Sequence, residues 1–329
     1  DRSVSRGLGD VYKRQLLMHT HINPSTLIFN DTIWQMKPAD LTVADKRVEV
    51  HNFEISHAPQ YILIDGVASD QENDLLNIQL NDVDLDYIFG TLNIKHVSFG
   101  GNATGNLVAS HLFTPAPRLS TEQFDVRNFA YNGAVFGDLH LFSMWDNDNQ
   151  GILMKGFVEN PEEKQTYIDG YIFPTRDSLA LSFDPDRLNI AFLQPFVETV
   201  MTDVSGVASG HIDFYGNFKA LNVTGDAYVE NFNFGIGYLN TRYTLTDSIH
   251  FSPTRIWFDN VTVYDKLRHT AKGSGWLSHH NFKDLAYDIA ITDARDFLSY
   301  DMTERQSPTY YGTIYGTGSA LIKGEPGYN

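Results

Sequence analysis

The sequence contains no cysteine among its 329 residues. This absence excludes disulfide bonds, thiolate nucleophiles and cysteine-based zinc sites, and it leaves the compartment open. The sequence also has no run of about 18 apolar residues, so no segment is expected to cross a bilayer as a helix. The least polar stretch, residues 188–201, is interrupted by Asn189, Gln194 and Glu198. The start shows no hydrophobic signal-peptide region either.

Basic side chains are scarce. The chain has 24 Lys and Arg against 41 Asp and Glu, a formal net charge of -17. Nucleic acid is therefore not expected as a partner, because its binding depends on Lys and Arg displacing counterions from phosphates. The same charge repels anionic membrane surfaces, so any lipid would have to be held by an apolar interior.

Residues 4–15 (VSRGLGDVYKRQ) resemble translated sequencing-adapter read-through rather than a biological segment. We therefore treat residues 1–15 as a non-native, adapter-derived segment and leave them out of fold reasoning. Both ends are accordingly expected to be truncations, and the missing targeting signals carry no information.

What the sequence does contain is typical of β-structure. Hydrophobic residues make up 42% and aromatic residues 13% of the chain, with 25 glycines. From about Leu75 onward apolar and polar residues alternate, which predicts strands with one buried face. The alternation changes phase at Asn231, after which Phe232 and Phe234 take the apolar positions, as a β-bulge requires. Strand, turn, strand patterns favour antiparallel pairing.

A long repeat divides the chain. The pattern G-x-[AI]-x-G begins at Gly101, Gly206 and Gly312, about 105 residues apart. Glycine at alternate strand positions lets a neighbouring backbone approach closely. We predict a weakly assigned N-terminal β segment over 16–74, one repeat over 75–187, a second over 188–297 and the start of a third over 298–329.

Acidic residues cluster upstream of each glycine pattern. Asp82 and Asp84, then Asp184 and Asp186, then Asp293 and Asp296 each follow an alternating segment. Asp is favoured at helix N-caps because it satisfies unpaired N–H groups. Each cluster therefore predicts a short helix at a repeat boundary. The fold class we expect from these patterns is mainly β, elongated and repetitive with such helices, and the patterns leave open whether the cross-section is an open groove or is closed.

The second and third repeats resemble the TamB translocation and assembly module family, AsmA-like proteins, in its Bacteroidota form. The resemblance lies in residues 203–216 (DVSGVASGHIDFYG), 221–227 (LNVTGDA), 232–240 (FNFGIGYLN), 271–277 (AKGSGWL) and 310–318 (YYGTIYGTG). It covers 188–329 closely and 75–187 more loosely. None of these motifs is catalytic.

The resemblance implies a periplasmic β-taco groove lined by apolar side chains. In the full-length parent, an N-terminal helix would anchor it in the inner membrane and the C-terminal end would meet an Omp85-type outer-membrane barrel. Its expected function is to conduct phospholipid toward the outer membrane, to support outer-membrane protein assembly, or both. Phospholipid acyl chains are then the expected ligands, with no enzyme activity, cofactor or metal.

If the groove is open, the alternation predicts its lining on the strands around the second repeat. We expect it to consist of Val223, Ala227, Val229, Phe232, Phe234, Leu245, Ile249, Phe251, Ile256, Phe258, Val261 and Val263. A packed β core requires the same pattern, so the alternation alone leaves both readings open.

Other chemistry has weaker support. Asp146 and Asp148 resemble the start of a calcium loop, but Phe157 occupies the position of the bidentate Glu, so a hairpin turn is favoured. Asp184 and Asp186 fit the cap better than an acid/base pair. His279 and His280 point to opposite faces of a strand. His19 and His21 share a face when extended but have no nearby acid in sequence.

Two other functional classes stay open. A surface β-solenoid acting as an adhesin or glycan-binding module would use exposed aromatics such as Trp34, Trp145, Trp257 and Trp276 to stack on sugars. A β-helical polysaccharide enzyme would require carboxylates clustered in a cleft. No G-x-S-x-G motif or phosphate-binding glycine loop is present to support another enzyme class.

Overall fold

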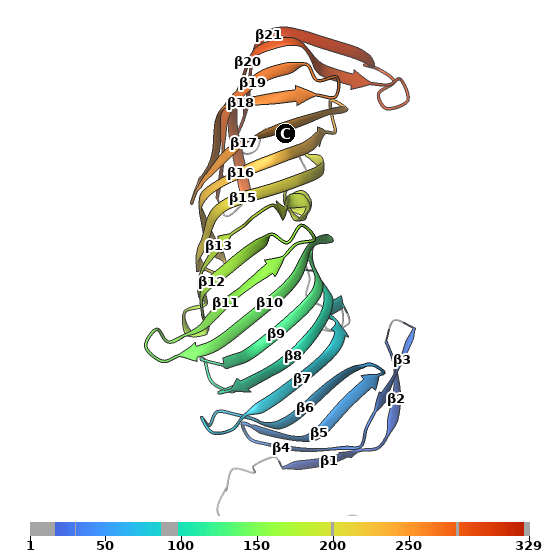
Figure 1. Cartoon of the computed structure of the whole chain (residues 1–329), viewed down its shortest axis with the longest axis vertical. Coiled ribbons are helices and arrows are strands. Elements are labelled where there is room, and N and C mark those ends of the chain that lie inside the picture. Colours follow the sequence, from blue (N-terminus) through green and yellow to red (C-terminus); the bar gives the residue numbers. More distant parts are fainter. Residues whose placement is uncertain (1–16, 30, 87–97, 199–200, 281–282, 326–329) are drawn as a thin grey trace, which may run out of the picture. The chain divides into compact units, whose positions relative to one another are not determined.

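The protein is mainly β, as the sequence predicts. The computed structural model describes residues 17–29, 31–86, 98–198, 201–280 and 283–325 (Figure 1). Strands account for 74% of it, and they form an antiparallel sheet of 21 strands that is not closed within these ranges. The adapter-like residues 1–15 lie outside the described residues.

The chain separates into two compact units, and we describe each by itself. Unit 1 comprises the described residues up to Asn81 together with Asn106–Leu119. Its strands are β1 (Met18–Ile22), β2 (Ser25–Phe29), β3 (Thr32–Met36), β4 (Ala39–Ala44), β5 (Arg47–His57), β6 (Gln60–Ser69) and most of β7 (Leu76–Asp84). β1, β4, β5, β6 and β7 pair in that order, and the β2–β3 hairpin joins through β3 and β5.

Unit 2 comprises Asp82–Gly105 and the described residues from Ser120 onward. From β9 onward its strands follow one another as a long meander in which each pairs with the next, except that β13 pairs with β15 and the short β14 lies beside β15. They are β8 (Phe99–Ser110, in part), β9 (Arg118–Tyr131), β10 (Ala134–Asp146), β11 (Gly151–Glu159), β12 (Gln165–Phe173), β13 (Ser178–Asp184), β14 (Leu188–Asn189), β15 (Thr202–Asn217), β16 (Ala220–Ile236), β17 (Thr241–Ser252), β18 (Arg255–Asp265), β19 (Thr270–His280), β20 (Lys283–Met302) and β21 (Gly312–Gly324).

The predicted helices are only partly present. The 3₁₀ helix η1 (Pro174–Arg176) lies before β13, and the 3₁₀ helix η2 (Ile190–Leu193) and the short helix α2 (Gln194–Val197) follow it. The N-cap of η2 is Asn189, whose side chain accepts the Ala191 N–H, and not Asp184 or Asp186. After β7, Asp84 accepts the Asp86 N–H, and residues 87–97 lie outside the described ranges.

The helix predicted at Asp293 and Asp296 is wrong. Strand β20 continues through both residues to Met302. Each adopts a positive φ, 51° for Asp293 and 47° for Asp296, and the register with β21 shifts around them. Asp tolerates this left-handed conformation because its short polar side chain can bond locally. The acids here form a bulge within a strand rather than a helix cap.

The same device recurs in other strands and explains how the sheet bends. A residue with positive φ interrupts the strand, and its backbone N–H donates to a side-chain oxygen of the next strand; we call these corner residues. In unit 1 the corner is Asn52, bonded to Asp65. In unit 2 the corners bonded to hydroxyl or carboxylate groups are Asp82 to Thr104, Asn128 to Asp138, Arg187 to Ser209, Asn231 to Thr246, Asn260 to Ser274 and Asp296 to Thr317.

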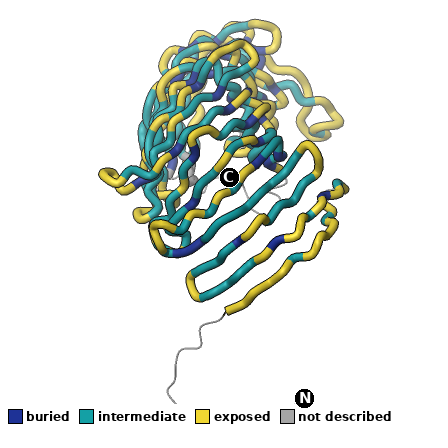
Figure 2. The backbone as a smooth tube through the Cα atoms, turned by 60° about the horizontal axis from the view of Figure 1, so that its bottom comes forward, coloured by how far each residue is buried: buried dark blue, intermediate teal, exposed yellow. Residues whose placement is uncertain are grey.

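The bulge predicted at Asn231 is confirmed. Its φ is 50°, and the pairing of β16 with β17 skips from Val229 to Phe232. An extra residue on one strand resets the alternation, so apolar side chains before and after the corner point to the same face. Along the strands of unit 2, buried positions therefore alternate with more exposed ones (Figure 2).

A buried carboxylate fixes the turn between β18 and β19 against β20. Asp265 is 3% exposed and accepts the backbone N–H groups of Leu267, His269 and Leu298, each at 2.8–2.9 Å. Burial alone would raise the pKa of Asp265, but the hydrogen bonds from Leu298, His269 and Leu267 outweigh it and hold the pKa below its ordinary value.

At a corner residue, Gly and Val substitutions should affect stability in the opposite order from that at an ordinary strand position. Asn231→Gly should retain or slightly raise thermal stability, whereas Asn231→Val should lose about 1–2 kcal/mol, because a β-branched residue resists positive φ. Circular dichroism melting of both variants measures this. Asn222, in β16 but without positive φ, is the matched control, and there Val should be tolerated better than Gly. The same ranking at both positions would contradict the corner assignment.

Acid should weaken unit 2 through Asp265. A carboxylate with a lowered pKa stabilises the fold above its unfolded pKa of about 3.9, and this contribution is lost as the pH falls through the lower folded value. Asp265→Asn should cost about 1–3 kcal/mol at pH 7, since its amide nitrogen cannot replace either the oxygen that accepts from Leu298 or the one that accepts from Leu267 and His269. It should also flatten the acid dependence in urea denaturation. Asp169→Asn, at an exposed ion pair with Lys155, should change little. Equal losses of stability in the Asp265→Asn and Asp169→Asn variants would argue against this role of Asp265.

Candidate functional site

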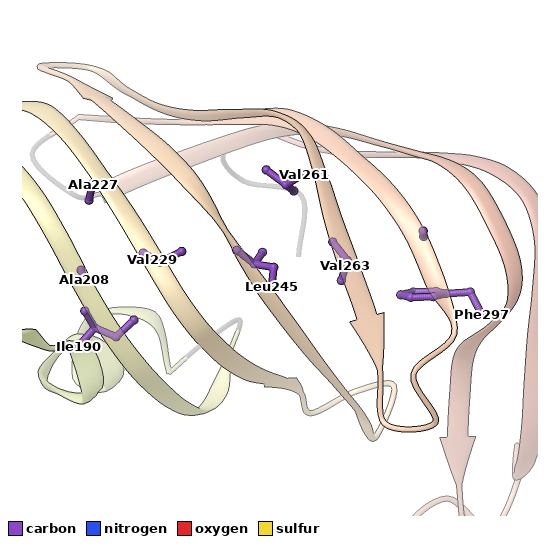
Figure 3. Packing of buried hydrophobic residues seen from close by; sticks show 9 residues of the cluster. Ile190, Ala208, Ala227, Val229, Leu245, Val261, Val263 and Phe297 are labelled. Atoms are coloured by element: carbon purple, nitrogen blue, oxygen red, sulfur yellow. The ribbon is translucent and has the colours of Figure 1, made fainter. Parts of the chain in front are cut away.

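The candidate site is the apolar face of the sheet in unit 2, from β15 to β20. Its buried cluster consists of Ile190, Ala208, Ala227, Val229, Leu245, Val261, Val263, Ala271 and Phe297. Figure 3 shows these side chains spread over successive strands and η2 rather than gathered at one point. Larger half-buried side chains adjoin them, among them Phe232, Phe251 and Phe258.

Cross-strand pairing places the predicted lining residues on this one face. Phe232 lies opposite Leu245, and Leu245 lies opposite Val263. A second row joins Phe251 to Ile256, and Ala227 lies opposite Ile249. Directly opposed residues point to the same side of a sheet, as do residues two apart along a strand. Ten of the twelve predicted residues belong to the buried cluster or pack against it, whereas Val223 and Ile256 do not.

The lining residues differ in how much they are covered. Those that are buried are Val223, Ala227, Val229, Leu245, Val261 and Val263, whereas Phe232, Phe234, Ile249, Phe251, Ile256 and Phe258 are of intermediate exposure. Within the described ranges every strand pairs into the same sheet. In these ranges, strands β17 and β20 do not pair with each other, but they touch where Phe297 stacks on Tyr243. The small aliphatic residues are covered by their larger neighbours, and the larger ones remain accessible.

A chain of aromatic rings runs along one edge of the face. Ring centroids are 5.2 Å apart between Phe232 and Phe234, 5.8 Å between Phe234 and Tyr243, and 5.2 Å between Tyr243 and Phe297, which stack. The Tyr243 hydroxyl donates to the Leu298 carbonyl at 2.9 Å. Burial raises the pKa of Tyr243, so its hydroxyl stays protonated at neutral pH.

Sequence reasoning missed three contributors to this face. Phe297 falls in the segment predicted as a helix, and Tyr243 was not among the predicted lining residues. Ile190 comes from η2 and packs on the cluster beside β15, together with Leu193. Gln194 fixes this helical segment because its side chain accepts the Val204 N–H and donates to the Met201 carbonyl. The hydrophobic spacing of residues 190–193 was the available signal.

The opposite face of the same strands is polar. His211 bonds Asp184 at 2.6 Å and lies 3.4 Å from Asp213, and His250 pairs with Asp226. The hydrogen bond to Asp184 raises the pKa of His211. His211, Asp226 and His250 lie directly opposite one another on β15, β16 and β17. The sheet therefore presents hydrocarbon on one side and paired charges on the other.

The alternative chemical sites do not assemble. Asp146 accepts hydrogen bonds from Asn149, Asp148 and Tyr171, which lower its pKa to about 2, and so it closes a hairpin turn. Asp184 is the partner of His211. In the described part of the chain, no group of three or more His, Asp or Glu side chains could hold a metal ion.

The histidines singled out by sequence have separate partners. His19 bonds the Thr42 hydroxyl at 2.9 Å, and His21 bonds Asp40 at 2.7 Å. His279 is buried, and the side chain of His280 lies outside the described residues.

The four tryptophans do not share a surface. Trp34, in unit 1, is buried at 2% exposure. Trp145 donates to Asn147. Trp257 stacks on His250 with centroids 5.2 Å apart, and its cross-strand neighbour Trp276 lies under the Arg255 guanidinium at 4.7 Å. Only the Trp257–Trp276 pair forms a common aromatic area, on the polar face.

Among the described residues, no helix has the length and apolar character needed to cross a membrane. No family model, curated protein or solved structure matches the chain. The resemblance to the TamB family therefore stays a prediction from the sequence.

Proposed function

We propose that unit 2 holds the acyl chains of phospholipids on its apolar face and lets them pass along it. The chain would then be a segment of a groove-shaped conduit carrying phospholipid toward the outer membrane, supporting outer-membrane protein assembly, or both. The observation that supports this proposal is an apolar face on strands β15–β20 whose larger side chains stay half-buried beside the buried cluster.

Hydrophobic burial supplies enough free energy for such binding. Each CH₂ group removed from water contributes about 0.8 kcal/mol, so a few methylene groups already give several kcal/mol. The half-buried Phe232, Phe251 and Phe258 offer accessible apolar area beside the buried cluster. Because this attraction is not directional, it permits a chain to slide between equivalent positions.

The distribution of charge agrees with this mode of binding. The polar face carries carboxylates such as Asp184, Asp213 and Asp226, and the whole chain has a net charge of -17. Adsorption of this face to an anionic bilayer is unfavourable. Lipid contact through the apolar face needs no charged group. A periplasmic location, an inner-membrane anchor and an Omp85-type partner belong to the proposal for the full-length parent and rest on the resemblance.

A glycan-binding module is the second candidate. The adjacent Trp257 and Trp276 on the polar face, with Asp288 opposite Trp276, combine aromatic rings and a carboxylate as sugar sites do. Trp257 is 37% exposed, but Arg255 covers Trp276. The aromatic area is therefore small, and lipid binding on the larger apolar face is favoured.

Photo-crosslinking should locate lipid on the apolar face. With benzoylphenylalanine at Phe232, Phe251 or Phe258, residues 16–329 incubated with phospholipid vesicles should give lipid adducts detectable by mass spectrometry. The same probe at Tyr228, an aromatic residue 48% exposed on the polar face of β16, should give few. Adducts mainly from Tyr228, or binding to a glycan array without lipid adducts, would overturn the proposal.

A charge on the apolar face should block lipid transfer. Phe251→Asp places a carboxylate where an acyl chain would lie, and a desolvation cost of 1.4 kcal/mol or more would lower binding at least about tenfold. Transfer of a fluorescent phospholipid between vesicles measures the effect. Tyr228→Asp is the matched change on the polar face and should leave transfer intact. Unimpaired transfer by a folded Phe251→Asp variant would exclude this lining.

A further inference from the structure

Strand β21 (Gly312–Gly324) has an open edge. It pairs with β20, and no other described strand pairs with it. It contains no proline, and its one charged side chain, Lys323, is bonded to Asp288 at 2.8 Å. Apolar residues along it are exposed, including Ile314 at 57%. Edge strands that lack charges, proline or a cover accept another strand.

The glycines of the earlier strands indicate which kind of neighbour the free edge of β21 would accept. Before β21, every glycine with positive φ inside a described strand faces a backbone carbonyl of an adjacent strand, or for Gly66 of the residue just before it, at the point where a Cβ would lie. These residues are Gly66, Gly101, Gly137, Gly170, Gly206, Gly210, Gly216 and Gly225. Glycine is needed there because the neighbouring backbone occupies the space of a side chain.

Gly312 and Gly318 in β21 have the same backbone conformation, with φ of 133° and 132°, but open space where the Cβ would lie. Their conformation resembles that of Gly206, φ 134°, whose Cβ position lies 2.7 Å from the Asn231 carbonyl oxygen of β16. We propose that the free edge of β21 binds an antiparallel β-strand whose backbone fills this space.

The two earlier glycine patterns indicate the chemistry of the partner. The Cβ position of Gly101 lies 2.7 Å from the Arg127 carbonyl oxygen and 3.0 Å from that of Asn128 on β9. That of Gly206 faces Asn231 and Glu230 on β16. Asn128 and Asn231 are both corner residues.

Both partner strands share a sequence around the corner. Residues 126–131 read VRNFAY and residues 229–234 read VENFNF. The third pattern, Gly312 to Gly316, should therefore bind a strand of the form V-x-N-F-x-aromatic with its Asn in the left-handed conformation beside Gly312.

The register follows from the second copy. In β15 and β16, Ala208 lies opposite Val229 and Ser209 lies opposite Tyr228. When the third glycine pattern is aligned with the second, Ile314 corresponds to Ala208 and Tyr315 corresponds to Ser209. The bound strand would thus place its Val beside Ile314 and the residue before Val beside Tyr315. This inference does not depend on lipid binding.

Disulfide trapping tests the edge and the register together, because the chain has no cysteine of its own. The probe is a synthetic peptide of residues Ala220–Ile236 carrying Tyr228→Cys, and the full chain carries Tyr315→Cys. A mixed disulfide should form several-fold faster than with a peptide carrying Asp226→Cys instead. Displacement of β16 by the peptide would give no disulfide with β21. Equal rates for both peptides would overturn the register.

Two further variants keep the test decisive. Asn231→Val in the unmodified, fluorescently labelled peptide should weaken binding to the chain about tenfold, because Val resists the left-handed conformation. Gly312→Val in the chain should abolish binding, while Gly133→Val, at a turn glycine with open space around it, should not. Binding insensitive to both changes overturns the proposal. Dimers of the chain crosslinked through Tyr315→Cys without peptide would show that a second copy, not this strand type, occupies the edge.

Discussion

The hydrogen bond from a left-handed corner residue to a side-chain oxygen of the next strand is the interaction on which the sheet depends. Without an acceptor such as Thr246 or Ser274, the N–H displaced by each bulge would lose its partner. With it, a strand can change direction and still keep its apolar side chains on one face. Asn231 in unit 2 and Asn52 in unit 1 use the same solution. One-sided hydrophobicity follows from these corners.

The alternation of residue types predicted the strands and the shared face because side-chain direction in a strand has a strict period of two. The bulge at Asn231 was predictable because it shifts that period. The corner at Asp296 was not, since an Asp before apolar residues is equally typical of a helix N-cap, and only its pairing with Thr317 distinguishes the two. Phe297 was lost from the predicted site for the same reason.

Whether the apolar face is open or packed could not be predicted from sequence. Val261 and Phe258 would alternate with polar residues in a packed sandwich as well as in a groove, because both need one dry face. The glycine pattern was more informative: it predicted close approach of a neighbouring backbone, and Gly101, Gly206 and Gly210 show this approach. A glycine pattern indicates where a neighbouring backbone lies, whereas an aliphatic residue indicates only that its position is shielded from water.

The meander in unit 2 also determines how local unfolding spreads from strand to strand. Each strand contacts mainly the strands before and after it, so cooperativity is local and resembles that of a linear array. Heating or denaturant would then fray the unit from its terminal strands, through partly melted forms rather than one concerted transition. Strands such as β16 and β17, which have partners on both sides, would exchange their amide hydrogens last.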